Sequence, residues 1–183
     1  MEEGKSPKDY ARPETLKYLD KIKLYWEVGK GDSGVSMLPQ VSFGYGYCGA
    51  IALLNGREGG LSHTDSDDGN ILYHLDKMIG DFDVPPEELK AIPIAGKGME
   101  TLKRCCKDRG IKVVNEYQGD WYFDHLERMF YYPRDVLLVP SLREVIIYTR
   151  EGKIHKLFDP FSDFSESKPY PNLLEREFSF WAL

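Results

Sequence analysis

The stretch VSFGYGYCGAIALLN (Val41–Asn55) decides the expected fold, because it is apolar and is interrupted by glycines. The turn NGREGG (Asn55–Gly60) follows it and leads into the short segment GLSH (Gly60–His63). An Asn-Gly pair between two extended segments is a typical hairpin signal. The sequence therefore predicts two neighbouring strands, with Cys48 and His63 facing each other at one rim of a sheet.

Downstream of this hairpin, the apolar residues change to helical spacing. One helix is expected from Ser66 to Asp81, because Asp67 and Asp68 suit the first turn of a helix. Further helices are expected over Met99–Gly110 and over the aromatic segment Trp121–Tyr132. The other expected strands cover Lys21–Val28, Ala91–Gly96, Ile111–Tyr117, Asp135–Ser141 and Arg143–Ile154. Strands and helices do not alternate cleanly, so the pattern favours an α+β fold.

The composition describes a folded, acidic chain of 183 residues. Hydrophobic residues make up 42% and aromatic residues 13%, which excludes an intrinsically disordered chain. The net charge of −6 argues against binding by neutralisation of phosphates, so neither nucleic acid nor a membrane is an expected partner. No apolar run has the roughly 18–20 residues of a membrane span, and the N-terminus MEEGKSPKDY lacks a signal-peptide pattern. We expect one cytoplasmic domain over residues 1–183, with a peripheral N-terminal arm (1–20) and a C-terminal tail (160–183).

The three cysteines are Cys48, Cys105 and Cys106, an odd count without the spacing of a disulfide framework. This usage is typical of a reducing compartment, where a thiol is catalytic or buried. Cys105 and Cys106 lie in an expected helix, and we interpret both as buried structural residues. Cys48 has two interpretations. It is either a small buried hydrophobic residue in a strand, or a nucleophile activated by His63, because the reactive form of cysteine is the thiolate.

The residues around Cys48 also resemble a known family. VSFGYGYCGAI (Val41–Ile51), followed by GLSH, is similar to the chemoreceptor glutamine deamidase family (CheD). The catalytic strand of that family carries Thr-x-Gly-x-Gly-Ser-Cys, and a Gly-x-x-His segment follows it. Ser42 stands at the family's threonine, Cys48 at its nucleophile and His63 at its base.

The resemblance implies a layered α-β-β sandwich of mixed sheets with two or three helices packed on one face. It also implies a catalytic triad of Cys48, His63 and Ser42. The residues expected near the oxyanion are Gly46, Tyr47 and Gly49. The implied activity is hydrolysis of a carboxamide, most simply deamidation of a glutamine side chain on a protein, without a cofactor and with a protein regulator as a further candidate partner. A different class of function stays open: a CheD-like protein-binding module that has lost its activity.

Two departures from the family pattern lie at the expected site. Ser42 replaces the threonine, and Tyr47 replaces the serine before the nucleophile. Ser42 precedes Cys48 by an even number of residues, which would place both side chains on one face of an extended segment. We therefore expect the Ser42 hydroxyl to accept a hydrogen bond from His63 and to orient its ring.

The other histidines carry weaker signals. A zinc site formed by Cys48, His63 and His74 lacks the spacing of paired ligands, so no metal is expected. His74 is interpreted as a packing or surface residue, and His125 and His155 have no partner at a suggestive spacing.

Overall fold

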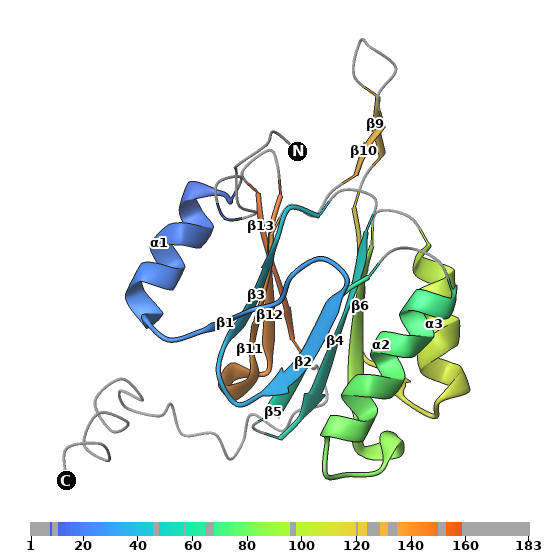
Figure 1. Cartoon of the computed structure of the whole chain (residues 1–183). Coiled ribbons are helices and arrows are strands. Elements are labelled where there is room, and N and C mark those ends of the chain that lie inside the picture. Colours follow the sequence, from blue (N-terminus) through green and yellow to red (C-terminus); the bar gives the residue numbers. More distant parts are fainter. Residues whose placement is uncertain are drawn as a thin grey trace, which may run out of the picture.

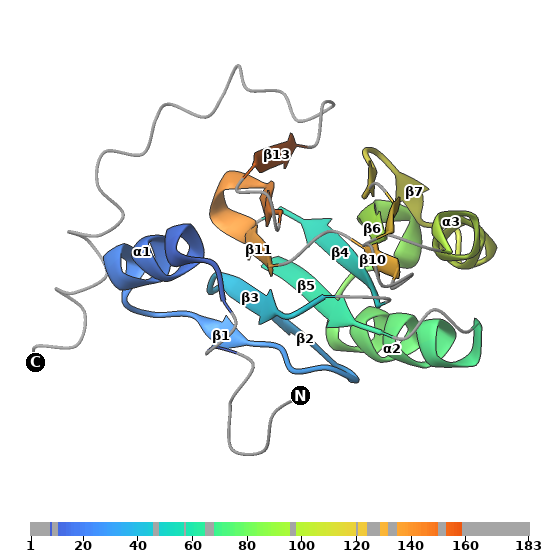
Figure 2. The ribbon, with the colours of Figure 1, turned by 90° about the horizontal axis from the view of Figure 1, so that it is seen from above.

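The computed structural model describes residues 8, 11–45, 48–56, 58–64, 68–95, 98–119, 121–123, 129–131, 135–149 and 153–158. Two sheets pack face to face, and helices lie on their outer faces (Figures 1 and 2). The expected α+β sandwich is confirmed.

The first sheet has five strands, in the order β1-β3-β11-β12-β13. Only β1 and β3 run parallel; the other neighbours are antiparallel. The strands are β1 (Trp26–Glu27), β3 (Gln40–Phe43), β11 (Asp135–Val139), β12 (Glu144–Tyr148) and β13 (Ile154–Phe158).

The second sheet has the order β2-β5-β4-β6-β7, with β8 also paired to β6. The hairpin expected around the Asn-Gly turn is confirmed, because β4 and β5 are antiparallel and Asn55 pairs with Glu58. Both β7 and β8 run parallel to β6, so this sheet is mixed as well. The strands are β2 (Asp32–Ser36), β4 (Gly49–Asn55), β5 (Glu58–His63), β6 (Lys90–Ala95), β7 (Lys112–Val113) and β8 (Tyr117–Gln118).

The core between the sheets is apolar and closely packed. It is formed by buried side chains such as Leu138 and Ile147 from the first sheet and Ala52 and Leu61 from the second. The sheets approach each other closely at Gly59, where an added Cβ would lie 2.8 Å from Pro140 Cγ and 2.9 Å from Leu138 Cδ2. A residue without a side chain is therefore required there, since close-packed interiors leave no room for a methyl group at that distance.

Strand β3 also joins the two sheets through polar contacts. The Gln40 side-chain amide donates to the Gly59 carbonyl (2.6 Å) and accepts from the Leu61 amide (3.0 Å). Gln40 and Ser42 are two residues apart on this strand, so both side chains point toward the second sheet. This arrangement sets the position from which Ser42 contacts β5.

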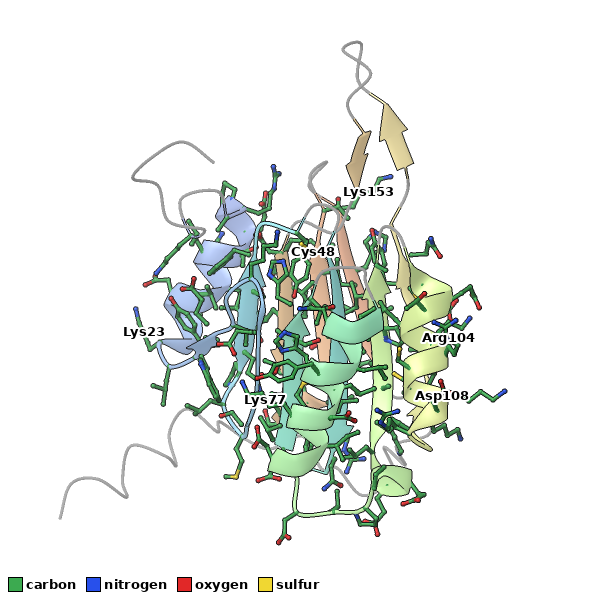
Figure 3. The ribbon with its side chains drawn as sticks, turned by 45° about the vertical axis from the view of Figure 1, so that its right-hand side comes forward. Lys23, Cys48, Lys77, Arg104, Asp108 and Lys153 are labelled. Atoms are coloured by element: carbon green, nitrogen blue, oxygen red, sulfur yellow. The ribbon has the colours of Figure 1, made fainter. Side chains whose placement is uncertain are left out.

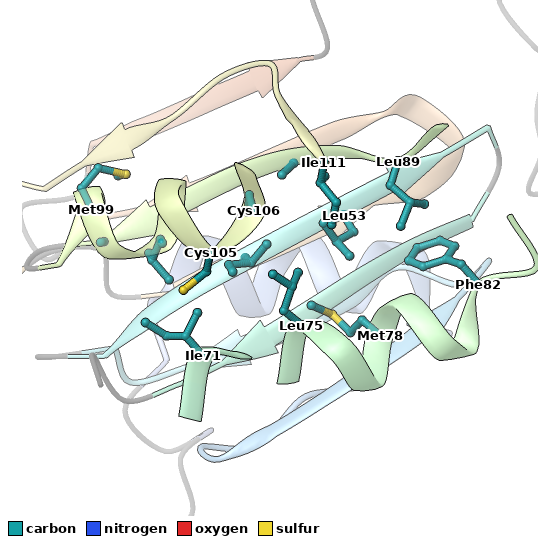
Figure 4. Close-up of a cluster of buried hydrophobic side chains, with 14 residues drawn as sticks. Leu53, Ile71, Leu75, Met78, Phe82, Leu89, Met99, Cys105, Cys106 and Ile111 are labelled. Carbon is teal, nitrogen blue, oxygen red and sulfur yellow. The ribbon is translucent and has the colours of Figure 1, made fainter. Parts of the chain in front are cut away.

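Two helices cover the outer face of the second sheet. Helices α2 (Asp68–Asp81) and α3 (Met99–Asp108) bury apolar side chains against β4 and β6, and Figure 4 shows this cluster. The sequence predicted both helices. The short 3-10 helix η2 (Pro86–Glu88) precedes β6, and η3 (Pro140–Leu142) follows β11.

Helix α1 (Pro13–Ile22) lies on the outer face of the first sheet. Leu19 packs there against a cluster that includes Val41 and Leu137. Asp135 anchors the start of the helix, because its Oδ2 accepts from the Arg12 amide (2.8 Å) and from Thr15 Oγ1 (2.7 Å). Helix α1 therefore occupies much of the expected N-terminal arm, of which residues 1–7, 9 and 10 lie outside the described residues.

The strand expected over Lys21–Val28 is wrong for most of its length. Helix α1 continues to Ile22, and only Trp26 and Glu27 form a strand. Leu19 and Ile22 are spaced by three residues and pack on the first sheet together, which extends the helix beyond the point where the alternation began. Tertiary packing therefore outweighs the local alternating pattern.

The helix expected over Trp121–Tyr132 is also wrong. This part of the chain contains two antiparallel strands, β9 (Trp121–Phe123) and β10 (Met129–Tyr131), which extend beyond one end of the sandwich in Figure 1. Aromatic residues favour strands, and two short aromatic runs can mimic helical spacing. The expected C-terminal tail (160–183) lies outside the described residues.

None of the helices among the described residues is long and apolar enough to cross a membrane.

Candidate functional site

The site lies where the β4–β5 hairpin opens at one end of the second sheet. Gly49 and Thr64 form the last bridge of the ladder. Continuing the register from Ala52 and Leu61 places Ala50 opposite His63. Cys48 precedes Ala50 by two positions, so Cys48 and His63 are diagonal neighbours on one face of the sheet.

This face points into the interior between the two sheets. Cys48 belongs to the buried cluster between them and is 6% exposed, while His63 is 2% exposed. Figure 3 shows Cys48 toward the end of the sandwich from which β9 and β10 extend. The thiol and the imidazole therefore lie in a desolvated environment at the rim of the sandwich.

Ser42 reaches His63 from the other sheet. Its Oγ lies 2.8 Å from His63 Nδ1 and donates a hydrogen bond to the Val28 carbonyl at 2.6 Å. A hydroxyl has one proton, and the carbonyl takes it, so the contact with His63 requires a proton on Nδ1. In the neutral ring, Nε2 then carries the lone pair.

The expected contact between Ser42 and His63 is thus present, but the geometry predicted for it is wrong. Ser42 and Cys48 do not share a face of one extended segment. Strand β3 ends at Phe43 in the first sheet, and the chain enters the second sheet at Gly49. Gly44 permits this change of direction with a φ of 72°, a value that other residues seldom adopt. The hydroxyl meets the imidazole across the interface between the sheets.

Tyr45 is a component of the site that the sequence did not reveal. Its ring stacks on the His63 imidazole, with centroids 3.9 Å apart and an interplanar angle of 15°. Its hydroxyl donates to the Ser62 carbonyl at 3.2 Å. Burial raises the pKa of the Tyr45 phenol well above its usual range, an interaction with Ser42 opposes this shift, and a charge on Cys48 would add to it. The only signal in the sequence was an aromatic residue between two glycines, which does not indicate a partner.

Of the three residues expected near the oxyanion, the structure describes Gly49. Gly46 and Tyr47 lie outside the described residues. The backbone amide of Gly49 donates to the Thr64 carbonyl at 2.9 Å. The sheet ladder therefore already uses the N–H group of Gly49, and the oxyanion role expected for this residue stays a prediction.

The other two cysteines are structural residues of α3. Cys105 and Cys106 are buried in the cluster beneath the helices. Burial raises the pKa of the Cys106 thiol to about 12, and the neighbouring Cys105 adds to this effect. A thiol with such a pKa is almost entirely protonated at neutral pH and is a poor nucleophile.

His74 does not join the site. It belongs to α2, on the outer face of the second sheet, where its Nδ1 lies 3.0 Å from Ser33 Oγ. His155 contacts the Tyr117 ring instead (4.9 Å between centroids), and His125 lies outside the described residues. Within the described part of the chain, no three His, Cys, Asp or Glu residues are grouped so that they could hold a metal ion.

No protein-family model matches the sequence, and no curated protein matches it. Among solved structures, the fold is similar to the crystal structure of the Neisseria meningitidis protein NMB0706, which the family model DUF152 describes. The two chains are 12% identical with a TM-score of 0.46, over 57% of this chain and 70% of the other. This relationship is distant, and it leaves the resemblance to the chemoreceptor deamidases a prediction.

Proposed function

We propose that this protein is a cysteine hydrolase that releases ammonia from a carboxamide, with the glutamine side chain of a protein as its substrate class. The observation that carries the proposal is the 2.8 Å contact between Ser42 Oγ and His63 Nδ1, whose direction the Val28 carbonyl fixes. It leaves Nε2 of a neutral, buried imidazole as a base. Cys48 lies on the same face of the sheet, and we assign it the role of the nucleophile.

Because Cys48 is buried, its thiol needs a neighbouring base in order to ionise. A thiol in an apolar interior resists ionisation, because the charged form loses its hydration. A neighbouring imidazole that accepts the proton offsets this cost by forming a thiolate–imidazolium pair. His63 is the base that the register of β4 and β5 brings to the face of Cys48.

The proposed reaction has two steps. The Cys48 sulfur attacks the amide carbon, and the proton of the thiol passes to His63. The imidazolium then protonates the departing nitrogen, so that ammonia leaves and a thioester remains. A water molecule, deprotonated by the same imidazole, attacks the thioester, and the sulfur departs as the thiol after it regains the proton. Backbone N–H groups of the segment around Gly46 and Tyr47 are the proposed oxyanion donors.

The choice of glutamine on a protein depends on the sequence resemblance. The residues SFGYGYC (42–48) and GLSH (60–63) match the spacing of the deamidase motif, and Ser42 retains the hydroxyl of the family's threonine. We extend the proposal to substrates that resemble chemoreceptor helices, with a protein regulator as a second partner. Departures such as Tyr47 change the surface around the nucleophile and therefore the selection of the substrate.

The experiment is an assay of ammonia release from glutamine-containing peptides and from helical chemoreceptor fragments, with mass spectrometry of the product. We expect turnover with the wild type and with Cys105→Ala, the matched control for loss of a buried thiol. We expect none with Cys48→Ala or His63→Ala. Release by Cys48→Ala at the wild-type rate would contradict the proposal. No release from any substrate, together with a Cys48 that alkylates no faster than a free thiol, would favour the binding-module alternative.

A further inference from the structure

We infer that Tyr45 is a positioning residue for His63, and that its ring favours the imidazolium form of this histidine. The inference rests on the proposed function, because it assigns Tyr45 a part in maintaining the thiolate–imidazolium pair. Tyr45 is not one of the triad positions and lies between Gly44 and Gly46, at a position that the motif leaves unspecified.

The contacts around His63 show why a second support is needed. The hydrogen bond between Nδ1 and Ser42 Oγ holds one atom of the ring, and a single hydrogen bond does not by itself define the plane of a ring. The Tyr45 ring lies nearly parallel to the imidazole at 3.9 Å between centroids. It therefore blocks tilting on one side, and the two contacts together fix both the position and the plane of the imidazole.

Tyr45 is itself held in place by the strand that carries His63. Its hydroxyl donates to the carbonyl of Ser62, the residue before His63, and its side chain is 1% exposed. The ring and the imidazole are thus attached to adjacent residues of β5. Because Ser62 and His63 are neighbours on β5, a shift of this strand moves the Tyr45 ring and the imidazole together and preserves their stacking.

The stacking also has an electrostatic consequence. The face of an aromatic ring is negative, so it attracts a cation placed against it, most strongly where water is excluded. A protonated His63 gains this attraction, and a neutral His63 does not. The raised pKa of Tyr45 keeps the phenol neutral, so it does not compete for the proton. Loss of the ring would therefore make the Cys48 thiolate harder to form.

The test is the pH dependence of Cys48 alkylation by iodoacetamide, followed by mass spectrometry of the full-length protein. Tyr45→Phe keeps the ring and removes the hydroxyl with its contacts to Ser62 and Ser42, so we expect a midpoint close to that of the wild type if the ring is what matters. Tyr45→Leu and Tyr45→Met remove the ring and should raise the midpoint by about one pH unit, in line with a cation–π contact in a desolvated site. Turnover should fall about tenfold in kcat with little change in KM.

The same substitution made in the His63→Ala variant distinguishes this inference from the proposed function. In His63→Ala, the added Tyr45→Leu substitution should cause no further shift, because Tyr45 acts only through the imidazole. A wild-type midpoint in folded Tyr45→Leu or Tyr45→Met, or an equal shift without His63, would overturn the inference. Failure of the proposed function shows differently: the wild-type midpoint would lie at or above the value of about 8.5 for a free thiol, because Cys48 is buried, and would not respond to His63→Ala.

The wild-type protein offers a measurement that needs no variant. Protons of an imidazole stacked on a phenol ring are shifted upfield in the NMR spectrum by its ring current. We expect this shift for His63 and not for His155, which contacts Tyr117 at a tilted angle of 54°. Unshifted His63 resonances in the wild type would overturn the inference regardless of how the variants fold.

Discussion

The Ser42 hydroxyl lies 2.8 Å from Nδ1 of His63, although the two residues belong to different sheets. The contact therefore depends on how the sheets pack and is not a property of one local segment. Gln40, on the same face of β3, holds Gly59 and Leu61 of β5 through its amide. Strands β3 and β5 are thus joined both by the structural hydrogen bonds of Gln40 and by the candidate catalytic contact between Ser42 and His63.

The first prediction concerns this contact. Ser42→Ala removes the acceptor of the Nδ1 proton and leaves the Val28 carbonyl without its donor. We expect a loss of turnover of tens-fold and a loss of stability of about 1–2 kcal/mol, since a buried acceptor is left unsatisfied. Ser42→Thr retains the hydroxyl, restricts its χ1 rotation and should preserve or improve turnover. Kinetics and urea unfolding of both variants test this, and wild-type turnover in Ser42→Ala would remove Ser42 from the mechanism.

The second prediction is an order of thiol reactivity. Cys48 should be alkylated first near pH 6–7, because His63 lies on its face of the sheet and Cys48 is the most exposed of the three cysteines. The Cys106 thiol, with its pKa raised by burial to about 12, should react only after unfolding. Peptide mapping after brief iodoacetamide treatment measures the order. Labelling of Cys105 or Cys106 ahead of Cys48 would contradict it.

The third prediction concerns the close approach of the sheets. Gly59→Ala would place a methyl group within 2.9 Å of Leu138 Cδ2 and closer still to Pro140. We expect a loss of about 1–3 kcal/mol in the free energy of unfolding, as is typical of overpacking. Gly80→Ala is the matched control, because its Cβ would meet nothing within 4 Å and alanine favours a helix. Equal stability of the two variants in urea unfolding would show that the sheets can separate at Gly59 without cost.

Local signals explain what the sequence predicted correctly. The Asn-Gly turn predicted the β4–β5 hairpin, and helical spacing predicted α2 and α3. The aromatic segment from Trp121 to Tyr132 was assigned wrongly, because two short aromatic strands and one amphipathic helix have similar patterns at that length. Such ambiguity is inherent in short apolar runs.

The site shows where local patterns are insufficient. Cys48, His63 and Ser42 were chosen from a motif, and the contact between Ser42 and His63 is present. The expected geometry of this contact was wrong, because the chain passes from the first sheet to the second after Phe43. The spacing of residues in the sequence does not indicate such a change of sheet. Tyr45 was missed for the same reason. Its partner is on another strand, and only the packing of the two sheets reveals the stacking.

The last prediction concerns His74, a buried residue of α2 whose Nδ1 lies 3.0 Å from Ser33 Oγ. Burial lowers its pKa, Lys77 lowers it further, and Asp32 opposes the shift. The unfolded chain therefore binds more protons than the folded chain between the folded pKa and the unfolded value of about 6.5, so stability falls as the pH decreases through this window. His74→Gln keeps a polar side chain near Ser33 but cannot titrate. In urea unfolding near pH 7.5 and near pH 5.5, the wild type should lose more stability on acidification than His74→Gln. An identical loss in the wild type and His74→Gln would show that protonation of His74 does not oppose the packing of α2.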